Sequence, residues 1–279
     1  MAVRTALIQM RSGRDMARNL AEASALITEA AQRGAQLVLT PEMTNILEPD
    51  RARLRAIVQP ENEDVTVRGL SALSRTLGIW LLAGSLALKG ASSKLLNRSL
   101  LFAPDGSIMA RYDKIHLFDV DLPDGQRLCE SEAYEGGHDV PVTETPWGGL
   151  GLTICYDVRF PQLYLALAQA GAAFLTVPSA FTRVTGEAHW HVLLRARAIE
   201  TGSYILAPAQ GGRHESGRET YGHSLIVSPW GEIVAEGGEE PEVIMATIDA
   251  GESLRARRKI PAIFHARQLA LNTRGRVAT

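Results

Sequence analysis

Apolar and polar positions alternate in a way that predicts strands and helices in turn along the first third of the chain. The short apolar run at 5–10 indicates a strand, and apolar residues recur at helical spacing over 16–30 before a glycine. The run 35–42 indicates a buried strand, 67–78 a second helix and 79–88 another strand. This order is typical of an α/β layered domain.

Further along the chain, the sequence also shows patterns typical of β-hairpins. Residues 97–114 hold a Pro-Asp-Gly turn between two alternating runs, and 224–237 repeat the arrangement around Pro-Trp-Gly. Between the two hairpins, a glycine-punctuated strand at 149–155 leads to a helix at 161–171 and then to a buried strand at 172–181. Strands, helices and hairpins together predict a mixed sheet.

Composition narrows the class of function. Charged residues make up 22% of the 279 residues and the net charge is −2, without a basic stripe, so we expect no nucleic-acid partner. Two cysteines are too few for a disulfide framework and fit a reducing compartment. The first residues meet a charge and a glycine too early for a secretory signal, so a cytoplasmic location is expected.

One stretch without charged residues, between Arg159 and Arg183, is long enough to span a bilayer. It contains two prolines, a glycine and two glutamines. We interpret it as a buried helix followed by a buried strand, and we predict no membrane association.

Cys155 lies where the strand at 149–155 meets the helix that starts at Pro161. A sharp strand-to-helix connection exposes a side chain at the carboxyl edge of a sheet and directs backbone N–H groups into the same space. A nucleophile with an oxyanion hole needs this geometry. The alternative is a small buried apolar residue, which is what most free cysteines are.

Two charged residues are candidates to assist such a thiol. Glu42 follows a buried strand, at the edge where α/β sheets build their sites, and Lys114 follows a hairpin strand among apolar and acidic neighbours. The alternatives are a solvated carboxylate for Glu42 and a surface pair with Asp113 for Lys114.

The seven histidines do not show the spacing of a metal site. His189 and His191 lie two residues apart on a predicted helix, so their side chains point to different sides. We therefore predict no metal.

Glu42 in "PE", Lys114 in "YDKIHLFD" and Cys155 in "CYDVRFP" together resemble the Glu–Lys–Cys triad of the nitrilase superfamily of carbon–nitrogen hydrolases. Order, local motif and spacing all match, and the similarity runs from "ALIQM" to the "PWG" hairpin. The segments 178–215 and 221–232 are similar to the deaminated glutathione amidase branch.

This resemblance implies a four-layer α-β-β-α sandwich, a single carbon–nitrogen hydrolase domain over 1–279 and a homodimer. It implies no metal or organic cofactor and a small-molecule amide substrate. The last fifteen or so residues, 265–279, have weak periodicity and are expected to form a tail available to pack on a partner subunit.

The resemblance also implies a fourth catalytic residue, Glu130 in "RLCESEAYEGG", with Glu132 and Glu135 as neighbours that could be confused with it. Glu130 would orient Lys114. The positive charge of Lys114 is expected to lower the pKa of the thiol, so that part of the thiolate exists before substrate arrives.

In the implied reaction, Glu42 takes the proton of Cys155 and the sulfur attacks an amide carbonyl. Lys114 and the backbone N–H of Tyr156 hold the oxyanion. The amine leaves, and water hydrolyses the resulting thioester.

Arg159 is the predicted clamp for a substrate carboxylate, because a guanidinium matches a carboxylate bidentately. A salt bridge to Asp157 is its alternative role. Phe181 and Thr182 are predicted pocket-wall residues. The branch resemblance implies hydrolysis of deaminated glutathione to 2-oxoglutarate and cysteinylglycine. Alternatives are an ω-amidase acting on 2-oxoglutaramate and a non-catalytic or redox-sensing scaffold with a reactive Cys155.

Overall fold

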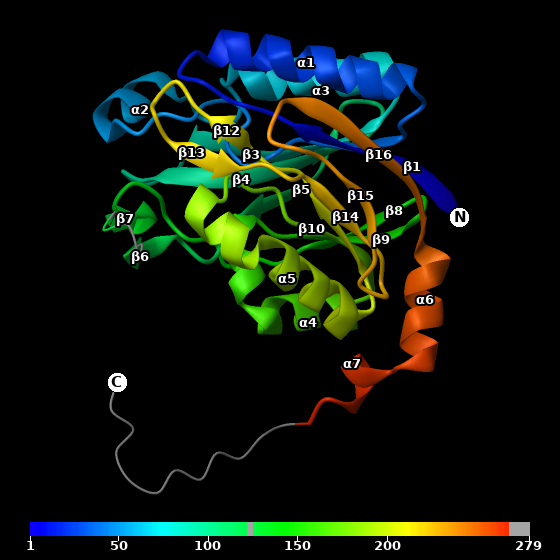
Figure 1. The fold of residues 1–279 in the computed structure, drawn as a ribbon. Coiled ribbons are helices and arrows are strands. Elements are labelled where there is room, and N and C mark those ends of the chain that lie inside the picture. Colours follow the sequence, from blue (N-terminus) through cyan, green and yellow to red (C-terminus); the bar gives the residue numbers. More distant parts are fainter. Residues whose placement is uncertain (122–124, 126, 268–279) are drawn as a thin grey trace, which may run out of the picture.

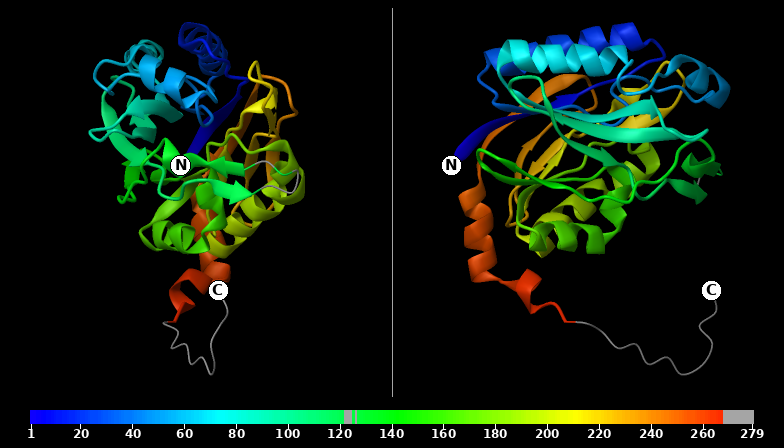
Figure 2. Two further views of the ribbon diagram at one scale, coloured as in Figure 1. Left: turned by 90° about the vertical axis from the view of Figure 1, so that its left-hand side faces the viewer. Right: turned by 180° about the vertical axis from the view of Figure 1, so that it is seen from behind.

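Two six-stranded sheets pack face to face in the computed structural model, which describes residues 1–121, 125 and 127–267. The helices are α1 (Met16–Gln32), α2 (Arg51–Ile57), α3 (Val65–Leu77), α4 (Pro161–Gln169), α5 (Arg183–Thr201), α6 (Ala250–Lys259) and α7 (Ala262–His265), with short 3-10 helices η1 (Glu130–Glu132) and η2 (Cys155–Arg159). Helices α1 and α3 cover the outer face of one sheet, and α4 and α5 cover the other (Figures 1 and 2). The predicted four-layer α-β-β-α sandwich is confirmed.

The first sheet has the strand order β16-β1-β2-β3-β4-β5. Its members are β1 (Ala2–Gln9), β2 (Leu37–Leu39), β3 (Trp80–Lys89), β4 (Leu95–Phe102), β5 (Ile108–Asp113) and β16 (Glu242–Asp249). Strands β1, β2 and β3 run parallel, whereas β16, β4 and β5 pair antiparallel to their neighbours. The carboxyl ends of the three parallel strands therefore meet at one edge.

The second sheet has the order β15-β14-β11-β10-β9-β8. Its members are β8 (Val142–Thr145), β9 (Gly148–Leu152), β10 (Ala172–Thr176), β11 (Tyr204–Ala207), β14 (Leu225–Val227) and β15 (Ile233–Glu236). Strands β9, β10 and β11 run parallel. Two small hairpins complete the described strands: β6 (Asp119–Asp121) with β7 (Arg127–Cys129), and β12 (Gly211–Arg213) with β13 (Glu219–Tyr221).

Side chains on the two faces of β1 belong to two different cores. Val3 and Leu7 are fully buried in the core between the sheets. Ala6 and Ile8 pack instead against residues of α1 and α3. Because successive side chains of a strand point to opposite faces, one strand can contribute to both layers.

The predicted helices in the first third are confirmed, and their ends follow local chemistry. The Asp15 carboxylate accepts hydrogen bonds from two N–H groups of the first turn of α1, and Asp64 caps α3 in the same way. Gly78 ends α3 in the left-handed conformation, with φ of 65°.

Two predicted strands are shorter than expected. Strand β2 ends at Leu39, before Pro41, and β10 ends at Thr176, before Pro178, because proline interrupts backbone pairing. Phe181 therefore lies in the loop that leads to α5 rather than at the end of a strand.

The uncharged stretch between Arg159 and Arg183 forms α4 and β10, as predicted. Among the described residues, every helix is too short or too polar to cross a bilayer. Most of the predicted tail, residues 268–279, lies outside the described residues.

Candidate active site

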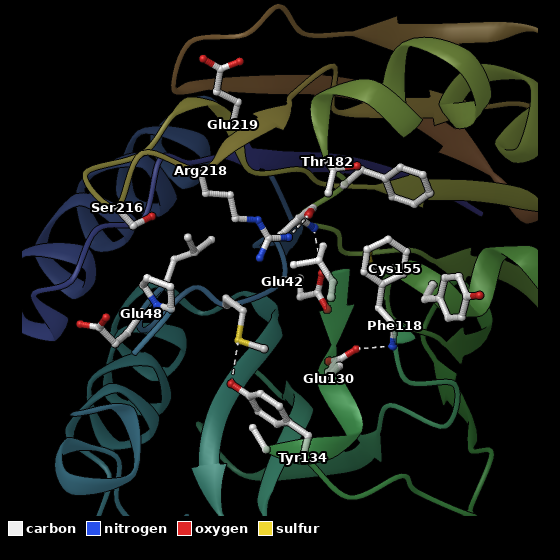
Figure 3. A pocket seen from close by; sticks show the side chains of 18 of the residues that line it. Glu42, Glu48, Phe118, Glu130, Tyr134, Cys155, Thr182, Ser216, Arg218 and Glu219 are labelled. Carbon is white, nitrogen blue, oxygen red and sulfur yellow. Dashed lines mark hydrogen bonds between the residues drawn. The ribbon is translucent and has the colours of Figure 1, made fainter. Parts of the chain in front are cut away.

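Glu42, Lys114, Glu130 and Cys155 all line one cavity of about 700 Å³. Glu42 follows β2 of the first sheet, and Cys155 begins η2 shortly after β9 of the second sheet. Lys114 follows β5 directly, and Glu130 begins η1. Figure 3 shows Glu42, Glu130 and Cys155 around the same hollow. The structure thus brings together the four residues that the resemblance assigned to catalysis.

Lys114 lies between two carboxylates. Its Nζ donates to Glu42 Oε1 at 2.8 Å, and to Glu130 Oε2 at 2.8 Å and Oε1 at 3.1 Å. The backbone N–H of Ala180 donates to Glu42 Oε2 at 2.8 Å, and that of Phe118 donates to Glu130 Oε2 at 2.7 Å. The predicted surface pair of Lys114 with Asp113 is absent from the described ion pairs, because Asp113 binds an arginine instead.

Asn97 completes this cluster, and sequence reasoning missed it. Its Nδ2 donates to Glu42 Oε1 at 2.9 Å and to Glu130 Oε1 at 3.1 Å, and its side chain is buried. The residue lies on β4, where its alternation with apolar neighbours gives no sign of a link to residues 55 and 33 positions away.

Burial and ion pairing shift the pKa values of this cluster in opposite directions, and the effect of ion pairing is the larger one. Burial would raise the pKa of Glu42, but the charge of Lys114 and hydrogen bonds from Lys114, Cys155 and Asn97 lower it below its usual range. Burial would likewise lower the pKa of Lys114, but both carboxylates raise it well above its usual range. The Glu42–Lys114 pair is therefore ionised at neutral pH.

Cys155 has a left-handed backbone conformation, with φ of 49°. Such a conformation is uncommon for residues other than glycine, and it is found where a sharp turn presents a nucleophile. The backbone N–H of Cys155 donates to the carbonyl of Pro178 at 2.9 Å, which ties the turn to the loop after β10.

The buried side chain of Asp157 stabilises the turn at Cys155. Its fully buried carboxylate accepts hydrogen bonds from the Tyr112 hydroxyl at 2.6 Å and the Ile154 N–H at 2.9 Å, and it lies 2.7 Å from His116 Nδ1. These partners come from β5, from the residues just after β9 and from the segment after Lys114. Asp157 therefore links the turn at Cys155 to β5, the strand that Lys114 follows.

The pKa of the Cys155 thiol differs from the value that the sequence predicted. Burial, and after it the Glu42 carboxylate, raise the pKa of Cys155 well above its usual range, and the ammonium of Lys114 offsets only part of this. Lys114 does lower the pKa of the thiol, as predicted, but the predicted net lowering is wrong, because burial and the Glu42 carboxylate outweigh it. The raised pKa favours the neutral thiol of Cys155 in the resting site.

Of the other predicted site residues, Tyr156, Phe181 and Thr182 line the cavity. Arg159 is not among the described lining residues: its guanidinium lies against the rings of Tyr156 and Phe181, 5.9 Å and 5.6 Å from their centroids. The predicted alternative, a salt bridge to Asp157, is also absent from the described ion pairs, because His116 occupies that carboxylate.

Arg218 is a lining residue that sequence reasoning missed. Its Nη2 donates to the carbonyl of Ala180 at 2.8 Å, beside the N–H that binds Glu42. In Figure 3 its guanidinium extends into the hollow near Glu42. The hairpin β12–β13 places it there, 63 positions after the cysteine, so proximity in sequence gave no signal.

The cavity offers no histidine among its described lining residues. His189 Nδ1 lies 3.3 Å from Arg159 Nη2, and His191 Nε2 lies 2.8 Å from a carboxylate of Glu236. The prediction that the two histidines point to different sides of the helix is confirmed.

The fold and the site together are those of an enzyme that hydrolyses carbon–nitrogen bonds. Residues 4–258 match the model of the carbon–nitrogen hydrolase family, and the chain belongs to this family. It is a hydrolase that acts on C–N bonds.

Named relatives and solved structures are similar over most of the chain. A deaminated glutathione amidase of Synechocystis sp. is 40% identical, over 93% of this chain and 96% of the relative. The crystal structure of the C. elegans NitFhit protein has a TM-score of 0.89 at 38% identity, over 95% of this chain and 65% of that one. An amidase mutant from Nesterenkonia sp. AN1, with the acetamide moiety of fluoroacetamide added covalently at its active site cysteine, has a TM-score of 0.77 at 28% identity, over 92% and 94% of the two chains.

Proposed function

We propose that this enzyme is a cysteine-dependent amidase that hydrolyses deaminated glutathione to 2-oxoglutarate and cysteinylglycine. The observation that carries the proposal is the buried Glu42–Lys114–Glu130 cluster in one cavity with a cysteine on a strained turn. The name of the Synechocystis relative supports the substrate, and the modified cysteine of the Nesterenkonia amidase supports a covalent route.

Acylation begins with a neutral thiol. As the sulfur of Cys155 bonds to the amide carbon, Glu42 takes its proton, so that a free thiolate does not accumulate. Lys114 and the backbone N–H of Tyr156 hold the oxyanion, and one such donor is worth about 3 kcal/mol in other hydrolases. When the tetrahedral adduct collapses, the C–N bond breaks and Glu42 returns the proton to the departing amine.

Deacylation uses the same groups in reverse order. Glu42 takes a proton from water as the water oxygen attacks the thioester carbon, and the proton passes to the sulfur when the C–S bond breaks. 2-Oxoglutarate leaves and the neutral thiol is restored. Glu130 holds the Lys114 ammonium in place during both steps.

The acidic end of the substrate requires a cation in the cavity. Arg218 is our leading candidate, because it lines the cavity and approaches Glu42, and its guanidinium can bind a carboxylate bidentately. The first candidate, Arg159, stays a prediction; its position against Tyr156 and Phe181 supports a role in holding the cavity wall.

Kinetics of Arg218→Lys and Arg159→Lys on deaminated glutathione and on a neutral aliphatic amide separate the two residues. The clamp variant should lose about tenfold to a hundredfold on the acidic substrate only, because one charged hydrogen bond is worth roughly 1.5–3 kcal/mol. A wall residue should lose the same factor on both substrates. If each variant lost the same factor on both substrates, the carboxylate clamp would lie elsewhere in the cavity.

The function itself is tested with deaminated glutathione, 2-oxoglutaramate, glutamine and a simple nitrile as substrates. A thioester on Cys155, detected by mass spectrometry, together with a preference for deaminated glutathione would support the proposal. A preference for 2-oxoglutaramate would favour the ω-amidase alternative. No turnover and no thioester would favour the scaffold.

We also propose a homodimer in the cytoplasm. Val192 and Ile199 on α5 and Trp230 in the β14–β15 turn are 69%, 58% and 53% exposed, which is a large apolar exposure for one face. The free cysteines support a reducing location. Sedimentation velocity of the wild type and of Val192→Asp tests the dimer, and a monomeric wild type would reject it.

A further inference from the structure

Three potential metal ligands from different elements meet outside the catalytic cavity. They are His191 on α5, His223 just before β14, and Glu236 at the end of β15. One ligand atom of each lies within 4.8 Å of the other two. His191 Nε2 is 2.8 Å from Glu236 Oε1, and His223 Nδ1 is 3.0 Å from the same oxygen. We propose that these three side chains bind a Zn²⁺ ion.

The donor set is the first support. Two imidazole nitrogens and one carboxylate oxygen are ligands that zinc prefers, and a water completes the tetrahedron. Both rings already direct a nitrogen at one carboxylate oxygen, so the ion would replace the ring N–H protons that now point there. The side chains of His191, His223 and Glu236 are 29%, 26% and 33% exposed, so the ion and its water can enter from solvent.

The backbone of His223 is the second support. Its φ is 53°, and the other two described non-glycine residues with positive φ are Met43, beside Glu42, and Cys155. Strain of this kind persists where the surroundings hold it and often marks a working site. Here the His223 N–H donates to the carbonyl of Gly238 at 2.8 Å, and its carbonyl accepts from the Trp190 indole at 2.8 Å.

Aromatic packing fixes the two rings. Tyr221 stacks on His223 with a centroid distance of 4.4 Å and meets His191 edge to face at 5.9 Å. The imidazole planes are thus positioned by contacts that do not use the ligating nitrogens. Preorganised ligands lose less freedom when an ion binds.

The ion would stiffen one wall of the catalytic cavity. Helix α5 begins directly after Phe181 and Thr182, and the Tyr221 N–H donates to the carbonyl of Phe181 at 3.0 Å. A cross-link between α5 and strand β15 would therefore hold that wall against the second sheet. The metal has a structural role in this proposal, and the proposal does not depend on which amide is the substrate.

The test is isothermal titration of chelator-treated protein with ZnCl₂, and Co²⁺ absorption spectroscopy. Because a cysteine is a competing zinc ligand, both measurements are made on the wild type and on Cys155→Ala. We expect one ion per chain in both proteins, and a tetrahedral cobalt spectrum without a thiolate charge-transfer band. His189→Ala, on the same helix, is the matched control and should bind as the wild type does.

His191→Ala and Glu236→Gln should each weaken zinc binding at least about tenfold, since losing a direct ligand costs no less than losing a group that orients one. Circular dichroism and melting without metal establish that each variant is folded, and zinc should raise the melting temperature of the wild type more than that of either variant. Absence of binding in the wild type would overturn the proposal. So would binding that Cys155→Ala removes and His191→Ala leaves unchanged, and the three residues would then form a hydrogen-bonded cluster that ties α5 to the hairpin.

Discussion

The two halves of the sandwich contribute opposite kinds of group to the same cavity. Strands β1, β2 and β3 run parallel in one sheet, and β9, β10 and β11 do so in the other. The end of β2 supplies Glu42, which is buried as an ion and held by Lys114. The end of β9 supplies Cys155, which is buried as a neutral thiol on a strained turn.

The difference shows two ways of preparing a buried reactive group. A charge that is buried away from water must be paired and hydrogen-bonded, so the first half surrounds its ions with Lys114, Asn97 and the backbone N–H of Phe118. A neutral thiol needs no partner, but it must be presented, so the second half uses backbone geometry and the carboxylate of Asp157. In the proposed mechanism, Glu42 and Lys114 are ionised before substrate arrives, whereas the thiol of Cys155 loses its proton only as it attacks the substrate.

The largest effect is expected for Cys155→Ala, which removes the proposed nucleophile and leaves the charged half intact. Loss of the nucleophile of a serine hydrolase costs roughly 10⁶ in kcat. Release of cysteinylglycine should therefore fall to background, with an unchanged melting temperature. Cys129→Ala, the other cysteine, is the control and should keep nearly full activity. Substantial turnover by Cys155→Ala would refute the mechanism.

Lys114→Met removes the ammonium that pairs with Glu42 and Glu130 in the charged half. Two carboxylates would be left facing each other in a buried space, and removing one partner of a buried ion pair costs about 3–5 kcal/mol of unfolding free energy. Urea denaturation at pH 7 measures the loss. Lys94→Met changes an exposed lysine just before β4 and should be within about 0.5 kcal/mol of the wild type. A variant of Lys114 as stable as this control would mean that the cluster is not ionised.

His214→Gln tests the junction of the two halves, where His214 lies 2.9 Å from the carbonyl of Ser12 and 2.7 Å from the Thr220 hydroxyl. Burial lowers the pKa of His214 to about 4 from its usual 6.5. Between these two pH values the unfolded chain binds a proton at this residue and the folded chain does not. The contribution of the neutral His214 to the unfolding free energy is therefore complete above pH 6.5 and falls as the pH drops towards 4.

The wild type should lose about 3 kcal/mol through this residue between pH 7 and pH 4. Urea denaturation across that range should give a shallower pH dependence for His214→Gln, whereas His138→Gln, at an exposed position, should keep the wild-type dependence. Parallel pH curves for His214→Gln and the wild type would contradict this assignment.

The smallest effect is expected for Asp157→Asn, which keeps the shape of the nucleophile turn but removes the charge that holds it. The loss of charge-assisted hydrogen bonds from Tyr112 and Ile154 should cost about 1–3 kcal/mol of stability. kcat should fall as well, because the turn is less well held. Thermal melting and kinetics check both effects against Asp139→Asn, an exposed control. An unchanged kcat would show that backbone contacts alone position Cys155.

Local pattern alone determined a good part of this protein. Apolar spacing located α1 and α3, the Pro-Asp-Gly turn located the β4–β5 hairpin, and the change of pattern at Cys155 located the strand-to-helix turn. Short motifs around Glu42 and Lys114 were enough to indicate the family. These properties depend on residues within a few positions of one another, so the sequence alone is enough to predict them.

Only the tertiary structure decided which distant groups meet and how dry their surroundings are. It brought Asn97 to two carboxylates, placed Arg218 rather than Arg159 at the cavity, and gathered His191, His223 and Glu236 from segments up to 45 positions apart. It also reversed the expected direction of the pKa of Cys155, because burial and the position of Glu42 outweigh the charge of Lys114. Solvation and Coulomb interactions depend on distance in space, which the order of residues along the chain does not specify.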